Sequence, residues 1–161
     1  MAERKEMIRI HLTSRHSESW EILQALRPEQ TSAQVYSHGS ESWTAQDVLA
    51  HLADSEAGLQ LQLRRLAGGE DGVPRDFDLA RWNRSAVKKG AGKSLDELRS
   101  QVLQAHEQAL ALLDELDEEA LDMRGYVSTG EMLSVEEVFL RIGNHRLEHA
   151  GDLKRAIEGE A

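Results

Sequence analysis

Apolar residues recur at steps of three and four positions through four long stretches of this chain. The stretches span about 3–26, 44–66, 94–116 and 134–159. This spacing places the apolar side chains on one face of a helix and the polar side chains on the other. β-branched residues are sparse, and glycine-containing segments separate the stretches. The pattern therefore predicts an all-α fold in which four amphipathic helices form a four-helix bundle.

Three of the four predicted helices begin with the same start signal. A hydroxyl residue is followed three positions later by an acidic residue, so each side chain can bond to the other residue's main-chain amide. The pairs are Thr44 with Asp47, Ser94 with Glu97, and Ser134 with Glu137. Pro28 ends the first helix, and Gly68 with Gly69 ends the second. These signals predict where the helices begin and end.

The connection between the second and third predicted helices is the longest in the chain. Residues 68–92 carry glycine at both ends, and residues 77–87 have the pattern of a short helix capped by Asp78. Residues 29–42 and 121–132 are expected to be loops. We therefore predict one domain, residues 1–161, with a long and partly helical middle connection.

Composition excludes several classes of protein. The chain has no cysteine, which rules out disulfides, thiolate ligands and a cysteine nucleophile. It has no run of about 18 apolar residues, and its first residues lack the apolar core of a secretory signal. The formal net charge is -10, and such an acidic surface would repel a phosphate backbone. We therefore expect a cytoplasmic protein that binds neither membranes nor nucleic acids.

Two histidines lie on the apolar stripe of the last predicted helix. His145 and His149 are four positions apart, so their imidazoles project from one face, close enough to bind the same ion. His51 lies on the apolar line of the second helix, where Ser55 and Gly58 leave space beside it. A lone inward histidine is usually a hydrogen-bonded core residue, but the pair elsewhere in the chain favours a ligand. We predict that His51, His145 and His149 bind one divalent metal ion.

Three imidazole ligands would leave positions open on the metal, which is typical of catalytic sites. The expected reactive group is then a metal-bound water or a metal-bound thiolate. Imidazole-only ligation suits zinc, nickel, iron or copper, of which zinc or nickel is expected, with iron as a further candidate. The carboxylates nearby in sequence are candidates to orient the ligands: Asp54, Glu56, Glu148 and Asp152. His106 is a further candidate, although it also fits a histidine bonded within the core. Trp82 and Asn83 are candidate substrate-binding residues at a pocket mouth, but Trp82 could equally plug one end of the core.

Three stretches carry a resemblance to a known family. They are residues 43–52, residues 78–87 with Trp82 and Asn83 at their centre, and His145-x-x-x-His149 followed by residues 150–153. On these motifs, residues 8–157 resemble the DinB-like superfamily, which includes bacterial proteins related to mycothiol-dependent maleylpyruvate isomerase. The resemblance implies a four-helix bundle of DinB/YfiT-like type. It also implies a divalent metal held by three histidines, which map to His51, His145 and His149.

The resemblance implies chemistry as well. Members of the family resemble thiol-dependent transferases and isomerases that use mycothiol or bacillithiol, others resemble metal-dependent hydrolases, and some resemble homodimers. We therefore expect a metal-dependent S-transferase or hydrolase that acts on a small molecule, in a homodimer. Two alternatives stay open: a non-enzymatic bundle that sequesters a small molecule or a metal, and a bundle whose histidines are structural and whose role is dimerisation.

Overall fold

The computed structural model describes residues 2–38 and 41–159 of the chain. Within them, four long helices are α1 (Ala2–Ala25), α2 (Ala45–Ala67), α4 (Leu95–Glu115) and α5 (Val135–Gly159). A shorter helix, α3 (Leu79–Gly90), lies in the connection between α2 and α4. The predicted all-α bundle with a partly helical middle connection is therefore confirmed. No helix in this part of the chain is both long enough and apolar enough to cross a membrane.

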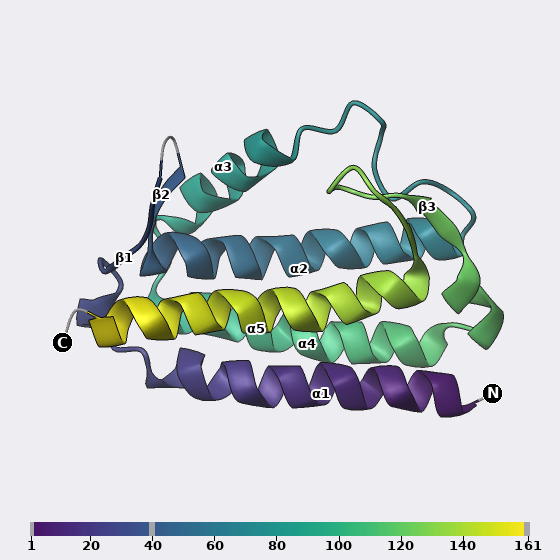
Figure 1. Cartoon of the computed structure of the whole chain (residues 1–161), viewed down its shortest axis with the longest axis horizontal. Coiled ribbons are helices and arrows are strands. Elements are labelled where there is room, and N and C mark those ends of the chain that lie inside the picture. The colour runs from purple at the N-terminus through teal and green to yellow at the C-terminus, as the bar shows by residue number, and fades with distance from the viewer. Residues whose placement is uncertain (1, 39–40, 160–161) are drawn as a thin grey trace.

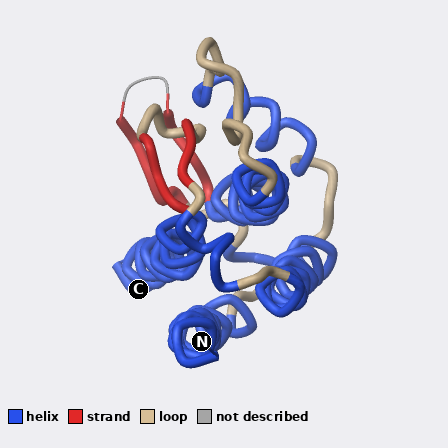
Figure 2. The backbone as a smooth tube through the Cα atoms, turned by 90° about the vertical axis from the view of Figure 1, so that its right-hand side faces the viewer, coloured by secondary structure: helices blue, strands red, loops and turns tan. Residues whose placement is uncertain are grey.

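The bundle has an unusual order of helix directions. Helices α1 and α5 run one way, whereas α2 and α4 run the other way (Figure 1). α1 packs against α4 and α5, and α2 packs against the same two helices. The parallel pair α2 and α4 requires a connection that returns along the bundle, and α3 forms part of it on the outside of α2 (Figures 1 and 2).

The predicted start signals are all present. Thr44 N donates to Asp47 Oδ2 at 2.9 Å, and Asp47 N donates to Thr44 Oγ1 at 3.4 Å. The same reciprocal pair opens α4 at Ser94 and Glu97, and α5 at Ser134 and Glu137. α3 is capped as expected by Asp78, whose Oδ1 accepts from the amide of Arg81. Each cap satisfies amides that have no partner inside the helix.

The prediction of two plain loops was wrong. An antiparallel hairpin is formed by β1 (Gln34–His38) and β2 (Glu41–Thr44), and a second by β3 (Arg124–Tyr126) and β4 (Met132–Ser134). Strands of three to five residues are too short to show a clear alternation of apolar and polar residues. Both hairpins lead directly into a capped helix, so they set the entry of the chain into α2 and α5.

The core is divided along the bundle. One apolar cluster surrounds Phe139, and the other surrounds Leu49. Between them lies a group of inward polar side chains, here called the polar layer: His16, Ser19, Glu56, His106 and Arg146. This layer joins all four long helices at the middle of the bundle.

An ion pair is the centre of the polar layer. Arg146 is 2% exposed and Glu56 is 1% exposed. Arg146 Nε and Nη2 donate to the two carboxylate oxygens of Glu56 at 2.6 and 2.7 Å. Arg146 Nη1 also contacts His16 Nδ1, and the His16 ring stacks on His106 with centroids 3.8 Å apart. The contacts tie α5 to α2 and, through the stacked rings, α1 to α4.

The contact between α2 and α3 provides a test of the fold. A Cβ atom added at Gly90 would overlap the Cβ of Ala50 and lie 3.3 Å from its Cα, which cannot rotate away. We expect Gly90→Ala to lower the free energy of unfolding by about 1–3 kcal/mol, because overpacked cores lose stability on this scale. Urea denaturation measures the change. Gly92→Ala is the control, since among the described residues no atom outside its chain neighbours lies within 4 Å of its added Cβ. An equal loss of stability in both variants would contradict the close contact between Gly90 and Ala50.

Candidate metal centre

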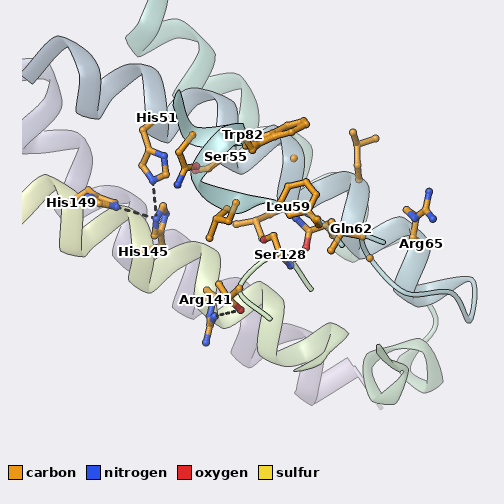
Figure 3. A pocket seen from close by; sticks show the side chains of 18 of the residues that line it. His51, Ser55, Leu59, Gln62, Arg65, Trp82, Ser128, Arg141, His145 and His149 are labelled. Carbon is orange, nitrogen blue, oxygen red and sulfur yellow. Dashed lines mark hydrogen bonds between the residues drawn. The ribbon is translucent and has the colours of Figure 1, made fainter. Parts of the chain in front are cut away.

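The three predicted histidines converge at one point between α2 and α5. His51 Nε2 lies 3.2 Å from His145 Nε2, and His149 Nε2 lies 3.0 Å from His145 Nε2. One ring nitrogen from each of the three lies within 4.8 Å of the other two. Figure 3 shows the rings pointing toward one another at one end of a cavity. The structure thus brings together residues that are 94 positions apart in sequence.

Helix geometry explains the convergence. His145 and His149 are one turn apart on α5 and therefore project from the same face. His51 comes from α2, which packs against α5. Glu56 follows His51 on α2, and Arg146 directly follows His145 on α5. The two side chains form a buried ion pair. The ion pair therefore holds the two helices in the register that the histidines need.

The donor set fits a divalent metal ion. Imidazole nitrogens bound at about 2.0–2.1 Å to a tetrahedral ion lie roughly 3.3 Å from one another. The separations of 3.0 and 3.2 Å in the structure are close to that value. Three neutral imidazoles whose Nε2 atoms face one another cannot all donate, so their lone pairs suit a cation between them. His51, His145 and His149 would be the residues that hold it.

The site also keeps its imidazoles neutral. Burial lowers the pKa of His51 to about 4, and the charge of His149 acts in the same direction, while nearby Asn83 opposes the shift. Burial lowers the pKa of His145 to about 3, with smaller contributions from His149, His51 and Arg141. Burial lowers the pKa of His149 too, against the charges of Asp152 and Glu148. At neutral pH the rings therefore carry the free lone pairs that metal binding requires.

A tyrosine from the first hairpin orients His149. The hydroxyl of Tyr36 donates to Asp152 Oδ2, so its oxygen is left to accept from His149 Nδ1 at 2.8 Å. This assigns the proton of His149 to Nδ1 and leaves Nε2 free to face the other two histidines. Burial and the hydrogen bond to Asp152 raise the pKa of Tyr36, which keeps its hydroxyl protonated. A hydrogen-bonded partner of this kind is typical of metal-binding histidines.

Replacing the tyrosine tests this arrangement. We expect Tyr36→Phe to weaken zinc binding by about 10- to 100-fold, the usual effect of losing a partner that orients a ligand. Competition with a chromophoric zinc chelator measures the affinity. Tyr126→Phe is the matched control, because among the described residues the hydroxyl of Tyr126 donates to the main-chain oxygen of Arg75 and to none of the histidines. Equal zinc affinities for Tyr36→Phe and the unaltered protein would contradict the assigned role.

The family follows from comparison with known sequences. A model of the DinB superfamily matches residues 11–153, which is most of the chain. The chain belongs to the DinB superfamily. No curated protein matches the sequence. The resemblance that the histidine motifs imply is therefore confirmed at the level of the family.

Solved structures with the DinB-type fold agree on the architecture. YfiT from Bacillus subtilis, described as a probable metal-dependent hydrolase with an unusual four-helix bundle topology, is 20% identical with a TM-score of 0.73, over 98% of this chain and 90% of YfiT. Mycothiol-dependent maleylpyruvate isomerase is 17% identical with a TM-score of 0.74, over 94% of this chain. This chain spans only 60% of that isomerase. These identities show a shared fold.

A third similar structure was solved with nucleic acid. The colibactin self-resistance protein ClbS, in complex with a double-stranded DNA, is 12% identical with a TM-score of 0.77, over 96% of this chain and 95% of ClbS. At this identity the likeness concerns the fold. The expectation that the present DinB protein does not bind nucleic acid therefore stays a prediction, supported by its net charge of -10.

Of four residues predicted to lie around the metal and its ligands, two line the cavity and two do not. Trp82 and Asn83 line the same cavity as the three histidines. Asn83 Oδ1 and His51 Nδ1 are both buried and lack a hydrogen-bond partner among the described residues, and Asn83 lies near enough to affect the pKa of His51. Glu148 is exposed and contributes only its charge near His149. His106 has other neighbours, because its ring stacks on His16 in the polar layer.

Tyr36 and Arg146 were not predicted to belong to the site, whereas Glu56 was a candidate to orient a ligand and instead pairs with Arg146. Tyr36 lies in a segment expected to be a loop, and its bond to His149 joins residues 113 positions apart. Glu56 reads in sequence as one acidic residue among 29. Only its place one helix turn beyond an inward histidine distinguishes it, and that signal is weak.

In the metal-free protein, the stacked histidines of the polar layer and the three histidines of the triad together make stability depend on pH. Burial lowers the pKa of His16 and of His106 to about 4, and the charge of Arg146 adds to both shifts. In the unfolded chain each takes up a proton near pH 6.5, whereas in the folded protein it does not. We therefore expect the metal-free protein to lose stability as the pH falls from about 6.5 toward 4, with no such loss above pH 6.5.

Urea denaturation at a series of pH values measures this effect. His106→Phe keeps an aromatic ring against His16 but removes one titrating group, so its stability should fall less steeply over the same range. A slope that is unchanged in His106→Phe would show that His106 is not the group that titrates.

Proposed function

We propose that the protein is a metal-dependent enzyme, an S-transferase or a hydrolase, that acts on a small molecule at the three-histidine site. The observation that carries the proposal is the position of the triad: His51, His145 and His149 converge at one end of a cavity of about 850 Å³. A structural metal is closed on all sides by protein ligands, whereas catalytic sites leave a position open to substrate. Three imidazoles that face a cavity of substrate size match the second case.

The chain's own residues supply positioning and an apolar environment. The lowered pKa values of His51 and His145 keep both rings neutral at working pH. Tyr36 holds the ring of His149, and the ring of Trp43 lies 5.1 Å from that of His51, which limits water around the ligands. Such pre-arranged groups lower the cost of organising the reacting atoms. Asn83 lines the cavity beside His51, where its side chain can hold a polar group of the substrate.

The metal itself would supply Lewis acidity, which lowers the pKa of a bound thiol or water molecule at this position. All-imidazole ligation suits zinc or nickel, with iron as a further candidate. The thiol that we propose is a low-molecular-weight thiol such as mycothiol or bacillithiol, by analogy with the isomerase of the same fold. The alternative is a bundle that binds a small molecule or a metal without turnover.

A screen of activity separates the two functions. Zinc- and nickel-loaded protein is incubated with electrophilic and ester or amide substrates, with and without mycothiol or bacillithiol. Thiol adducts or hydrolysis products that form with the loaded protein and disappear in His51→Ala would support the enzyme. No turnover in any arm by protein that retains one metal ion per chain would favour the alternative of sequestration.

A further inference from the structure

The cavity extends well beyond the histidines. On α2 the side chains that line it begin at His51 and end at Arg65, which are 14 positions and therefore roughly 21 Å apart along the helix. On α5 the lining residues His149, His145 and Arg141 are spaced by four, so Arg141 is one turn from His145 on the same face. Figure 3 shows Arg141 and Arg65 away from the triad, on opposite helices. The cavity is therefore elongated.

The charge of the cavity is opposite to that of the chain. The sequence contains 29 acidic residues and has a formal net charge of -10. Among the described residues that line the cavity, none is aspartate or glutamate, whereas Arg64, Arg65 and Arg141 are all present. Arg64 and Arg141 are paired with carboxylates outside the lining, so Arg65 is the arginine whose charge is most available to attract an anion.

The arginines retain hydrogen-bonding capacity. Arg65 Nε donates to the main-chain oxygen of Asp71 at 3.1 Å, and its charge helps to lower the pKa of the Asp71 carboxyl, but Arg65 forms no ion pair within 4 Å among the described residues. Arg141 is paired with Glu131, a residue outside the cavity lining, at 2.6 Å. A guanidinium has five N–H donors, so both side chains can bind a further oxyanion. Arg64 pairs with Glu115 at 3.4 Å, and both side chains of this pair are exposed.

The middle of the cavity is apolar. The rings of Phe77 and Trp82 lie 5.8 Å apart, and Leu59 and Val73 line the same region. Trp82 lies across Gly58, where an added Cβ would touch the indole ring at 3.6 Å. A ligand that crosses this region must therefore present apolar surface between the histidines and the arginines.

We propose that the cavity binds an elongated amphipathic anion. Its apolar body contacts Phe77 and Trp82, and its negatively charged group, a carboxylate or a sulfonate, lies beyond the histidines within reach of Arg65, the arginine farthest from the triad. The further statement that the other end of this ligand reacts at the triad rests on the proposed function. The selectivity for an anion does not, because it comes from arginines outside the triad.

A matched pair of fluorescent probes tests the selectivity. 8-Anilinonaphthalene-1-sulfonate and N-phenyl-1-naphthylamine share the same ring system, but only the first carries a negative charge. Binding is measured with metal-free protein, so failure of the metal centre cannot affect the result. We expect the sulfonate to bind about tenfold more tightly or better, because hydrogen bonds to a charged group are the strong ones. Equal affinities for the two probes would overturn the proposal.

Variants locate the site of the charge. Arg65→Gln should weaken binding of the sulfonate several-fold and leave binding of the neutral probe unchanged. Arg141→Gln should have the smaller effect, because Arg141 is one turn from the triad and is paired with Glu131. Arg27→Gln removes an exposed arginine outside the cavity and should change neither. If Arg65→Gln weakens both probes, Arg65→Lys decides: retained preference for the sulfonate supports the proposal, and lost preference overturns it.

A blocked cavity is the last control. Gly58→Leu places a side chain against Trp82 and should abolish binding of both probes. Circular dichroism checks that this variant is folded. Undiminished binding of the sulfonate to folded Gly58→Leu would place the probe on the outer surface and would overturn the proposal. A negative result with the probes would not affect the conclusions about metal binding. Absence of metal binding would likewise not affect the conclusions from the probes.

Discussion

Protein purified without a metal-affinity tag is expected to hold one divalent ion per chain, and His145→Ala is expected to hold almost none. His145 Nε2 is the atom that lies near both other ligands, at 3.2 and 3.0 Å, so its loss leaves two rings that no longer share a close neighbour. Loss of a direct ligand should weaken binding by more than the roughly 100-fold that loss of an orienting partner can cost. Elemental analysis after dialysis gives the metal content.

The control for this experiment is a histidine outside the triad. His11 lies on α1, where its Nε2 is 3.1 Å from the main-chain oxygen of Leu140. His11→Gln keeps a side-chain amide for that contact and should retain the full metal content. If His145→Ala retains the ion while folded, or if the unaltered protein never acquires one, the histidines are structural and the proposed enzyme is wrong.

Glu56→Gln is expected to lower the free energy of unfolding by about 3 kcal/mol or more. The substitution leaves the guanidinium of Arg146 buried without a negative partner, which is far more costly than losing an exposed pair. Burial raises the pKa of Glu56, but the two short bonds from Arg146 favour the carboxylate form. Urea denaturation of the metal-free protein measures the loss.

Two further variants show that the loss comes from an unpaired charge. Glu115→Gln breaks the exposed pair with Arg64 and should cost no more than about 1 kcal/mol. The double variant Glu56→Leu with Arg146→Met replaces the buried pair by apolar side chains and should recover most of the stability lost in Glu56→Gln. A double variant that is less stable than the single one would contradict this explanation.

Local signals in the sequence were sufficient for much of the fold. A capping box needs only two residues three positions apart, so the starts of α2, α4 and α5 at Thr44, Ser94 and Ser134 could be predicted. The spacing of His145 and His149 likewise fixes their common face. His51 could be added because it lies on an apolar helical line and because the pair elsewhere in the chain gave it a role.

Contacts between distant segments could not be predicted in the same way. The pairing of β1 with β2 rests on main-chain hydrogen bonds, which leave little trace in the choice of side chains. The bonds of Tyr36 to His149 and of Arg146 to Glu56 depend on how separate elements pack, and a single sequence contains no record of that packing. The stack of His106 on His16 has the same origin, and it separates His106 from the role first expected for it.

The position of the bound metal tests the central claim most directly. Crystals of the zinc-loaded protein, measured at the zinc absorption edge, should give one strong anomalous peak about 2.0–2.1 Å from Nε2 of His51, His145 and His149. A peak held by other side chains, or the absence of a peak among these three rings in zinc-saturated crystals, would contradict a three-histidine metal centre.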